Sequence, residues 1–185
     1  MSEYFPLPEG LEAPVDDGAA RHLEGRALPH VSLPSTKGGS VDLGTLPGRA
    51  VVYCYPLTGR PGSALPGGWN DIPGARGCTP QACSFRDHFA DLTRLGVSHL
   101  YGVSTQTTAY QREAAERLHL PFALLSDSAL EFQDMLDLPV MDVEGDTLFR
   151  RLTMICSDGE IEKVFYPVFP PDRNAGDVIS WLERH

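Results

Sequence analysis

Two cysteines, Cys78 and Cys83, are the residues whose type and spacing point most directly to chemistry. They lie in the segment 77–84, which reads GCTPQACS. A glycine before Cys78 and a proline two residues after it are typical of the first turn of a helix. A thiol at that position faces unpaired backbone N–H groups and the positive end of the helix dipole, and both favour the reactive thiolate. We therefore predict that Cys78 is a reactive cysteine.

Cys83 lies five residues further along the same predicted helix. In an intact α-helix this spacing places the two Cα atoms about 8–9 Å apart, about 140° around the axis. A disulfide requires less than about 7 Å, so pairing demands that at least one turn unwinds. The spacing therefore favours a working disulfide over a static one. The alternative for Cys83 is a small buried residue on the apolar face of the helix.

The other two cysteines, Cys54 and Cys156, lie in apolar runs and are predicted to be inert core thiols. Four cysteines could instead hold zinc, with Cys78 and Cys83 as two of the ligands. Zinc requires about four ligands in tetrahedral geometry, and no second pair of Cys or His has the spacing. We expect no metal and no organic cofactor.

Length and charge limit the remaining classes of function. The chain has 185 residues with 25 acidic and 15 basic side chains, a formal net charge of −10. This size suits one domain with a modest extension. The acidic balance argues against nucleic acid as a partner.

The sequence also suggests a location. No apolar run approaches the roughly 18 residues of a membrane span, so we expect no membrane association. Residues 1–6 show neither a basic start nor an apolar stretch, which argues against a signal peptide. We therefore expect a reducing, cytoplasmic setting in which thiols stay reduced unless they react.

Hydrophobic periodicity predicts an α/β domain that follows an extension at residues 1–27. Proline and acidic residues dominate the extension, with one possible short helix at 15–23 capped by Asp16 and Asp17. A long loop at 57–77 contains six Gly and three Pro, and loops of this kind are usually functional. Strands are predicted at 50–55, 97–103 and 121–125, hairpins at 30–43 and 152–166, and helices at 82–95, 109–118, 129–136 and 175–182. Alternating strands and helices with a closing antiparallel hairpin predict a layered domain with a central mixed sheet flanked by helices.

The segment 77–87, GCTPQACSFRD, resembles the peroxidatic helix of peroxiredoxins. Its C-x4-C spacing is similar to that of the Q subfamily, the bacterioferritin comigratory proteins. Further similarity extends over about 30–185 and includes the segments LPH (28–30), GVSTQ (102–106), LPFALLSD (120–127) and RLTM (151–154).

The resemblance implies a thioredoxin-like fold for residues 28–185, with an N-terminal β-hairpin. It also implies that a peroxide oxidises Cys78 to a sulfenic acid and that Cys83 condenses with it to a disulfide. Hydrogen peroxide and organic hydroperoxides would be the substrates, and thioredoxin or a similar dithiol would be the reductant. The resemblance also favours a monomer over an oligomer.

The chemistry of peroxide attack predicts further site residues. Attack on an O–O bond requires a thiolate, a cation and hydrogen-bond donors directed at the peroxide. The cation of the family matches Arg151 rather than Arg150, and strand alternation places these two side chains on opposite faces. Gly77 and Gln81, together with Pro56, are expected to contribute to the substrate-binding site.

One departure from the family pattern concerns the loop before Cys78. The family places a proline seven residues and a threonine three residues before the cysteine, where this chain has Asp71 and Ala75. We expect Thr58, or another donor such as Asn70, to replace the missing hydroxyl, although Thr58 also fits an ordinary turn residue. Pro56 is expected to shield the thiolate from the side.

Two other classes of function remain as alternatives, a thioredoxin-like disulfide reductase and a redox-sensing binding protein. Disulfide reductases usually carry C-x-x-C at a helix start, and this chain has no such motif.

Overall fold

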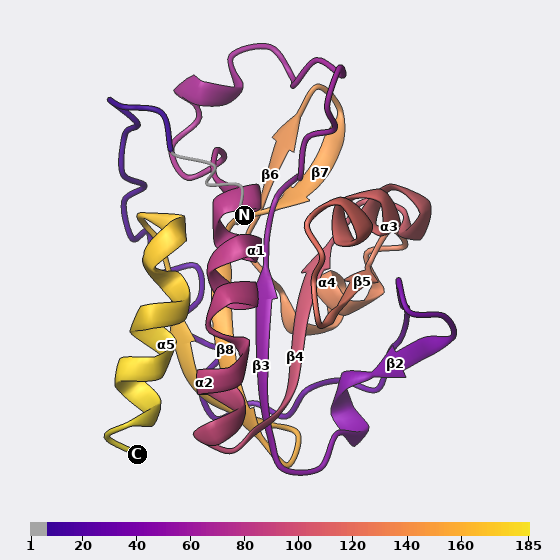
Figure 1. Cartoon of the computed structure of the whole chain (residues 1–185), viewed down its shortest axis with the longest axis vertical. Coiled ribbons are helices and arrows are strands. Elements are labelled where there is room, and N and C mark those ends of the chain that lie inside the picture. Colours follow the sequence, from indigo (N-terminus) through magenta and orange to yellow (C-terminus); the bar gives the residue numbers. More distant parts are fainter. Residues whose placement is uncertain (1–6) are drawn as a thin grey trace.

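A five-stranded mixed sheet forms the centre of the computed structural model, which describes residues 7–185 (Figure 1). The strand order is β5-β4-β3-β8-β9. Strands β5, β4 and β3 are parallel, β8 is antiparallel to β3, and β9 is antiparallel to β8. The prediction for residues 1–6 lies outside the described residues. The strands are β3 (Arg49–Cys54), β4 (Val97–Ser104), β5 (Ala123–Ser126), β8 (Leu152–Ser157) and β9 (Glu160–Phe165).

Alternation along β3 divides the core between the two faces of the sheet. Val51 and Tyr53 pack on one face, whereas Val52 and Cys54 pack on the other. The first face is covered by α1 (Cys78–Asp87), α2 (Phe89–Arg94), α3 (Thr108–Arg117) and α5 (Asn174–Leu182), of which α1, α2 and α5 lie over the sheet in Figure 1. The second is covered by α4 (Glu131–Leu136), the hairpin β1 (Ser32–Pro34) and β2 (Ser40–Asp42), and residues 20–28. The predicted mixed sheet, its flanking helices and the N-terminal hairpin are confirmed.

Two helix predictions require correction. The helix expected at 82–95 is divided at His88, whose φ of −100° and ψ of 9° leave the helical region. The helix expected at 15–23 is wrong, because this segment forms turns. The carboxylates of Asp16 and Asp17 accept hydrogen bonds from the amides of Gly18 and Ala19, and Gly18 has a left-handed φ of 77°. The two aspartates therefore close tight turns rather than cap a helix.

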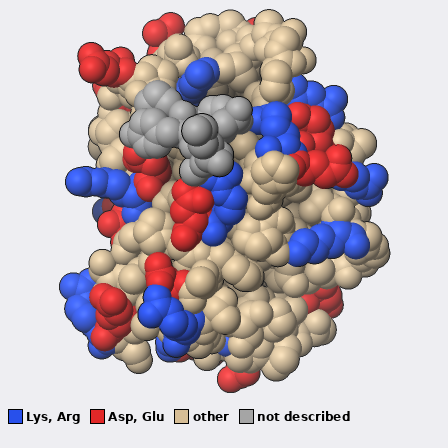
Figure 2. Space-filling model, in the orientation of Figure 1, with Lys and Arg blue, Asp and Glu red and all other residues tan. Residues whose placement is uncertain are grey.

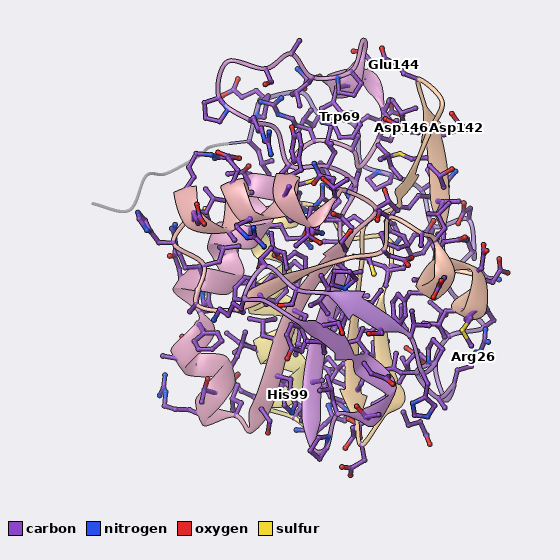
Figure 3. The ribbon with its side chains drawn as sticks, turned by 90° about the vertical axis from the view of Figure 1, so that its right-hand side faces the viewer. Arg26, Trp69, His99, Asp142, Glu144 and Asp146 are labelled. Carbon is purple, nitrogen blue, oxygen red and sulfur yellow. The ribbon has the colours of Figure 1, made fainter. Side chains whose placement is uncertain are left out.

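A hairpin that the sequence reasoning missed supports the long loop before Cys78. Strands β6 (Val140–Val143) and β7 (Asp146–Phe149) are joined by Glu144 and Gly145, both with positive φ, as a two-residue hairpin turn requires. Glu144 Oε1 accepts the amide of Gly67 at 3.0 Å, and Trp69 of the short 3-10 helix η2 (Trp69–Asp71) packs on the hairpin (Figure 3). The glycine-rich loop is therefore anchored.

The end of the N-terminal segment hydrogen-bonds to the start of β9, at the edge of the sheet. Gly25 N–H donates to the carbonyl of Ile161 at 2.8 Å, and Leu28 N–H donates to Gly159 at 2.7 Å. Leu23 is completely buried in the core cluster that includes Val52 and Phe132. Residues 20–28 thus supply core contacts behind the sheet.

The visible surface carries acidic and basic side chains in mixed order, without a large area of a single sign (Figure 2). Among residues 7–185, the structure contains no helix that is both long and apolar enough to cross a membrane.

We predict that Leu23→Ala lowers the free energy of unfolding by about 2–5 kcal/mol, because it leaves a cavity in a packed core. Val15→Ala is the control within the same segment. Val15 is 83% exposed, so its truncation is expected to change stability by less than about 0.5 kcal/mol. Urea denaturation followed by circular dichroism measures both, and equal stability of the two variants would contradict the core role of this segment.

Candidate active site around Cys78

Cys78 is the first residue of α1, and a glycine that the packing requires precedes it. Gly77 has a φ of +111°, a conformation that other residues rarely adopt. A Cβ atom at this position would lie 2.3 Å from Cγ of Pro171, in the short 3-10 helix η3 (Pro171–Arg173). Gly77 therefore allows η3 to pack against the start of α1, which positions Cys78.

Three segments of the chain meet at the sulfur of Cys78. Arg151 Nη2 donates to Sγ at 3.2 Å, and the backbone amide of Leu57 donates at 3.4 Å. The carbonyl of Ala75 lies 3.8 Å away as an acceptor for the thiol. The Leu57 amide was not foreseen, since nothing in a side-chain pattern identifies a backbone donor. The sulfur thus has one cationic and one neutral N–H donor.

Arg151, rather than Arg150, lies at the sulfur. Its Nη2 also donates to the carbonyls of residues 74–76 at 3.0–3.4 Å, and its side chain is buried. Arg150 points to the other side, where it forms an ion pair with Asp17 at 2.7 Å. The two arginines thus diverge, as strand alternation requires.

Gln81 holds the Arg151 guanidinium from within α1. Gln81 Oε1 accepts from Arg151 Nη1, and Gln81 Nε2 donates to Asn174 Oδ1 at 2.9 Å. Thr153 Oγ1 donates to the same oxygen of Asn174 at 2.6 Å. Asn174 and Thr153 were missed, because they are distant in sequence and carry no motif of their own. Gln81 is fully buried, so it contacts Arg151 rather than the surface of a pocket.

Thr58 lies near the site, but its hydroxyl donates elsewhere. Thr58 Oγ1 and the Thr58 amide both donate to Gln106 Oε1 at 3.1 Å, and Gln106 Nε2 returns a bond to the Thr58 carbonyl. This reciprocal pair ties the chain after β3 to the chain after β4 and so positions Leu57. Pro56 is buried next to Leu57, whereas the alternative donor Asn70 is exposed.

Cys78 opens into a cavity of about 340 Å³ between the long loop and α1. Gly77, Leu57, Leu65 and Trp69 form part of its wall, and three arginines complete it. Gln81, Pro56, Thr58 and Arg151 do not line it. The cavity is large enough for an organic hydroperoxide.

The other three cysteines differ from Cys78 in their surroundings. Cys83 lies in the same helix as Cys78, as predicted, and all four cysteines are present as thiols. Burial raises the pKa of Cys54, and that of Cys156 to about 12, because apolar surroundings disfavour the thiolate. Neither of these two sulfurs is therefore suited to nucleophilic attack.

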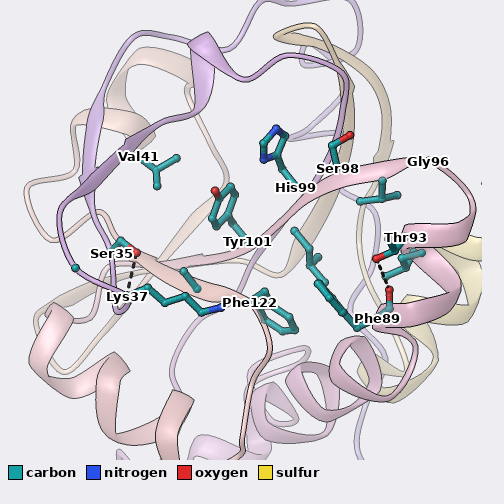
Figure 4. Close-up of a pocket in the computed structure, with 15 residues that line it drawn as sticks. Ser35, Lys37, Val41, Phe89, Thr93, Gly96, Ser98, His99, Tyr101 and Phe122 are labelled. Carbon is teal, nitrogen blue, oxygen red and sulfur yellow. Dashed lines mark hydrogen bonds between the residues drawn. The ribbon is translucent and has the colours of Figure 1, made fainter.

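A larger cavity, of about 620 Å³, lies beside the first half of β4 (Figure 4). Its wall includes Lys37, Phe89, His99 and Tyr101, and it contains no cysteine. The larger volume of this cavity is thus not matched by a thiol with donors at its sulfur, as Cys78 has, and the candidate site is the one around Cys78.

Comparison with known proteins identifies the family. The redoxin family model matches residues 23–179, and the chain belongs to this family. Within it, the chain is a peroxiredoxin, and its relatives are of the Q or Bcp type. Peroxiredoxin Bcp of Escherichia coli K12 is 32% identical over 166 residues, which cover 87% of this chain and 96% of the relative. The chloroplastic peroxiredoxin Q of Oryza sativa subsp. japonica is 28% identical over 184 residues, which cover 96% of this chain and 77% of the relative.

Solved structures agree in fold. Peroxidoxin BcpB from Mycobacterium tuberculosis superposes with a TM-score of 0.71 at 23% identity, covering 88% of this chain and 98% of that one. Xanthomonas campestris peroxiredoxin Q superposes with a TM-score of 0.67 at 20% identity, covering 89% of this chain and 97% of that one. The predicted thioredoxin-like fold is confirmed, and membership of the family makes the chain an oxidoreductase of the peroxidase class.

We predict that iodoacetamide at pH 8 modifies Cys78 in the folded protein but leaves Cys54 and Cys156 unmodified until urea unfolds the chain. Burial raises the pKa values of Cys54 and Cys156 above the value of about 8.5 that a cysteine has in an unfolded chain. Their contribution to the free energy of unfolding is therefore complete below about pH 8.5 and is lost as the pH rises towards 12. Peptide mass spectrometry checks the sites, and early modification of Cys156 would contradict its burial.

Proposed function

We propose that this chain reduces hydroperoxides with Cys78 as the nucleophile. The Cys78 thiolate attacks the terminal oxygen of the peroxide, so that an S–O bond forms and the O–O bond breaks. The leaving oxygen takes a proton and departs as water or an alcohol, and Cys78 becomes a sulfenic acid. The observation that carries the proposal is a sulfur that opens into a cavity while accepting hydrogen bonds from Arg151 and Leu57.

Each neighbouring group has a distinct role in this step. The Arg151 guanidinium stabilises negative charge on sulfur and on the departing oxygen, and the Leu57 amide is the second donor. Gln81 is a positioning residue, because it acts through Arg151. Thr58 acts through its bonds to Gln106, and buried Pro56 shields the sulfur from water.

The second half of the cycle uses Cys83. Its thiol attacks the Cys78 sulfenic acid, an S–S bond forms and water leaves. Because both cysteines lie in α1, the helix must first unwind. We expect the unwinding to be confined to α1, because α1 ends at His88 and α2 begins after it. Thioredoxin or a similar dithiol then reduces the disulfide.

The relatives support this assignment. A structural study of the Xanthomonas campestris bacterioferritin comigratory protein concerns its alkyl peroxide reduction activity. We propose the same substrate class here, together with hydrogen peroxide, for a monomer that acts in the cytoplasm. A disulfide reductase is less well supported, since α1 begins with C-x4-C rather than C-x-x-C.

We predict that Cys78→Ser abolishes peroxidase turnover and that Cys83→Ser preserves the first oxidation. After one equivalent of hydrogen peroxide, intact mass should show a loss of two hydrogens in the wild type and a sulfenic acid in Cys83→Ser. Excess peroxide should drive that variant to the sulfinic acid faster than the wild type. Cys156→Ser is the control and should behave as the wild type, whereas substantial turnover by Cys78→Ser would disprove the assignment.

We predict that Arg151→Met slows the reaction of Cys78 with peroxide about 10²–10³-fold, the loss typical of removing a donor to a developing charge. Arg150→Met removes the same charge one residue earlier and should leave the rate nearly unchanged, because Arg150 bonds to Asp17. Stopped-flow measurement of sulfenic acid formation compares the two. A greater loss in Arg150→Met would reverse the assignment.

A further inference from the structure

The cavity over Cys78 is positively charged, although the chain as a whole carries a net charge of −10. Three arginines line it, Arg60, Arg76 and Arg117, and no aspartate or glutamate is among the lining residues. Arg60 and Arg76 both belong to the long loop at 57–77. The net negative charge of the chain repels anions. A local excess of positive charge at the cavity would instead attract them.

Two of the three guanidiniums share a single carboxylate. Arg117 forms a hydrogen-bonded ion pair with Glu113 at 2.7 Å and also donates to the carbonyl of Gly59 at 3.0 Å. Arg60 lies over the ring of Tyr110 at 3.9 Å, and its Nε is 3.8 Å from Glu113. That Nε atom is buried and makes no hydrogen bond within the described residues. One negative charge therefore balances two positive ones.

Arg76 is the third cation, and its position differs. Within residues 7–185, no carboxylate lies within 4.0 Å of its guanidinium. Arg76 is two residues before Cys78, and its carbonyl accepts a hydrogen bond from Arg151 Nη2. The backbone of Arg76 is therefore held beside the Cys78 sulfur. The charge of Arg76 is thus available to a molecule that occupies the cavity.

We propose that the cavity contains an anion subsite, centred on Arg76 and bordered by Arg60 and Arg117, that selects hydroperoxides carrying a carboxylate. This inference rests on the proposed peroxidase function and names its preferred substrates. Guanidinium binds a carboxylate through paired, charge-assisted hydrogen bonds. The apolar wall formed by Leu57, Leu65 and Trp69 accepts the carbon skeleton between the two polar ends of the substrate.

The volume limits the size of the substrate. A cavity of about 340 Å³ holds about 11 groups of the size of water, at about 30 Å³ each. A compact hydroperoxide of about nine non-hydrogen atoms, such as 3-hydroperoxy-3-methylbutanoate, fits within that limit. Its uncharged amide has the same shape and is therefore the matched reference.

The first experiment compares kcat/KM for this carboxylate and its amide. In the wild type kcat/KM should be about tenfold higher for the carboxylate, which corresponds to the contribution of one charge-assisted hydrogen bond at a site that water can reach. Arg76→Gln should bring the ratio close to one. Arg112→Gln is the control, since it removes the same charge from an exposed position on α3 outside the cavity, and its ratio should equal that of the wild type. Concentrated salt should reduce the preference, because the subsite is open to solvent.

The second experiment measures occupancy without turnover. The unreactive alcohol 3-hydroxy-3-methylbutanoate should slow the alkylation of Cys78 by iodoacetamide in the wild type and not in Arg76→Gln. Equal kcat/KM for the two hydroperoxides, or an undiminished ratio in Arg76→Gln, would overturn the subsite while leaving the peroxidase function intact. Protection of Cys78 without turnover of either hydroperoxide would support the subsite and overturn the peroxidase function.

Discussion

A buried guanidinium organises this site. Arg151 lies in the interior, and among the described residues no carboxylate is within 4.0 Å of it. Taking a cation out of water is costly unless its donors are satisfied, so the surroundings must supply acceptors. The carbonyls of residues 74–76, Gln81 Oε1 and the Cys78 sulfur accept from its two Nη atoms, whereas its buried Nε has no hydrogen-bond partner among the described residues. The same bonds fix the loop, the start of α1 and the start of β8 relative to one another, so one charge aligns three segments.

The tight packing around α1 would oppose the resolving step that we propose. Ala82 and Phe85 of α1 are buried against the sheet, and the Phe85 ring stacks on Tyr53 with centroids 4.7 Å apart. Unwinding α1 to bring Cys83 to Cys78 must disrupt part of this packing, and local opening of a packed element costs free energy. In the proposed cycle we therefore expect resolution to be slower than for two aligned thiols, so that the sulfenic acid would stay exposed to a second peroxide for longer.

Sequence reasoning recovered the parts of the molecule that depend on local patterns. The sheet follows from periodicity, the helix start at Cys78 from Gly77 and Pro80 beside it, and the divergence of Arg150 and Arg151 from strand alternation. It failed where a single residue changes the backbone, as Gly18 does in the N-terminal turns and His88 does between α1 and α2. It also missed Asn174 and the Leu57 amide, because contacts made through the folded chain leave no spacing in the sequence.

The departure at Ala75 becomes intelligible from the geometry of the backbone. The family pattern places a hydroxyl three residues before the cysteine, whereas here Ala75 contributes its carbonyl to both Arg151 and Cys78. Donation to the sulfur comes from the Leu57 amide, on a segment that the Thr58–Gln106 pair holds in place. A backbone donor is present whichever side chain occupies position 57, proline excepted. The constraint on sequence thereby moves from the loop before Cys78 to the residues that position Leu57, which leaves that loop free to carry Arg60 and Arg76 into the cavity.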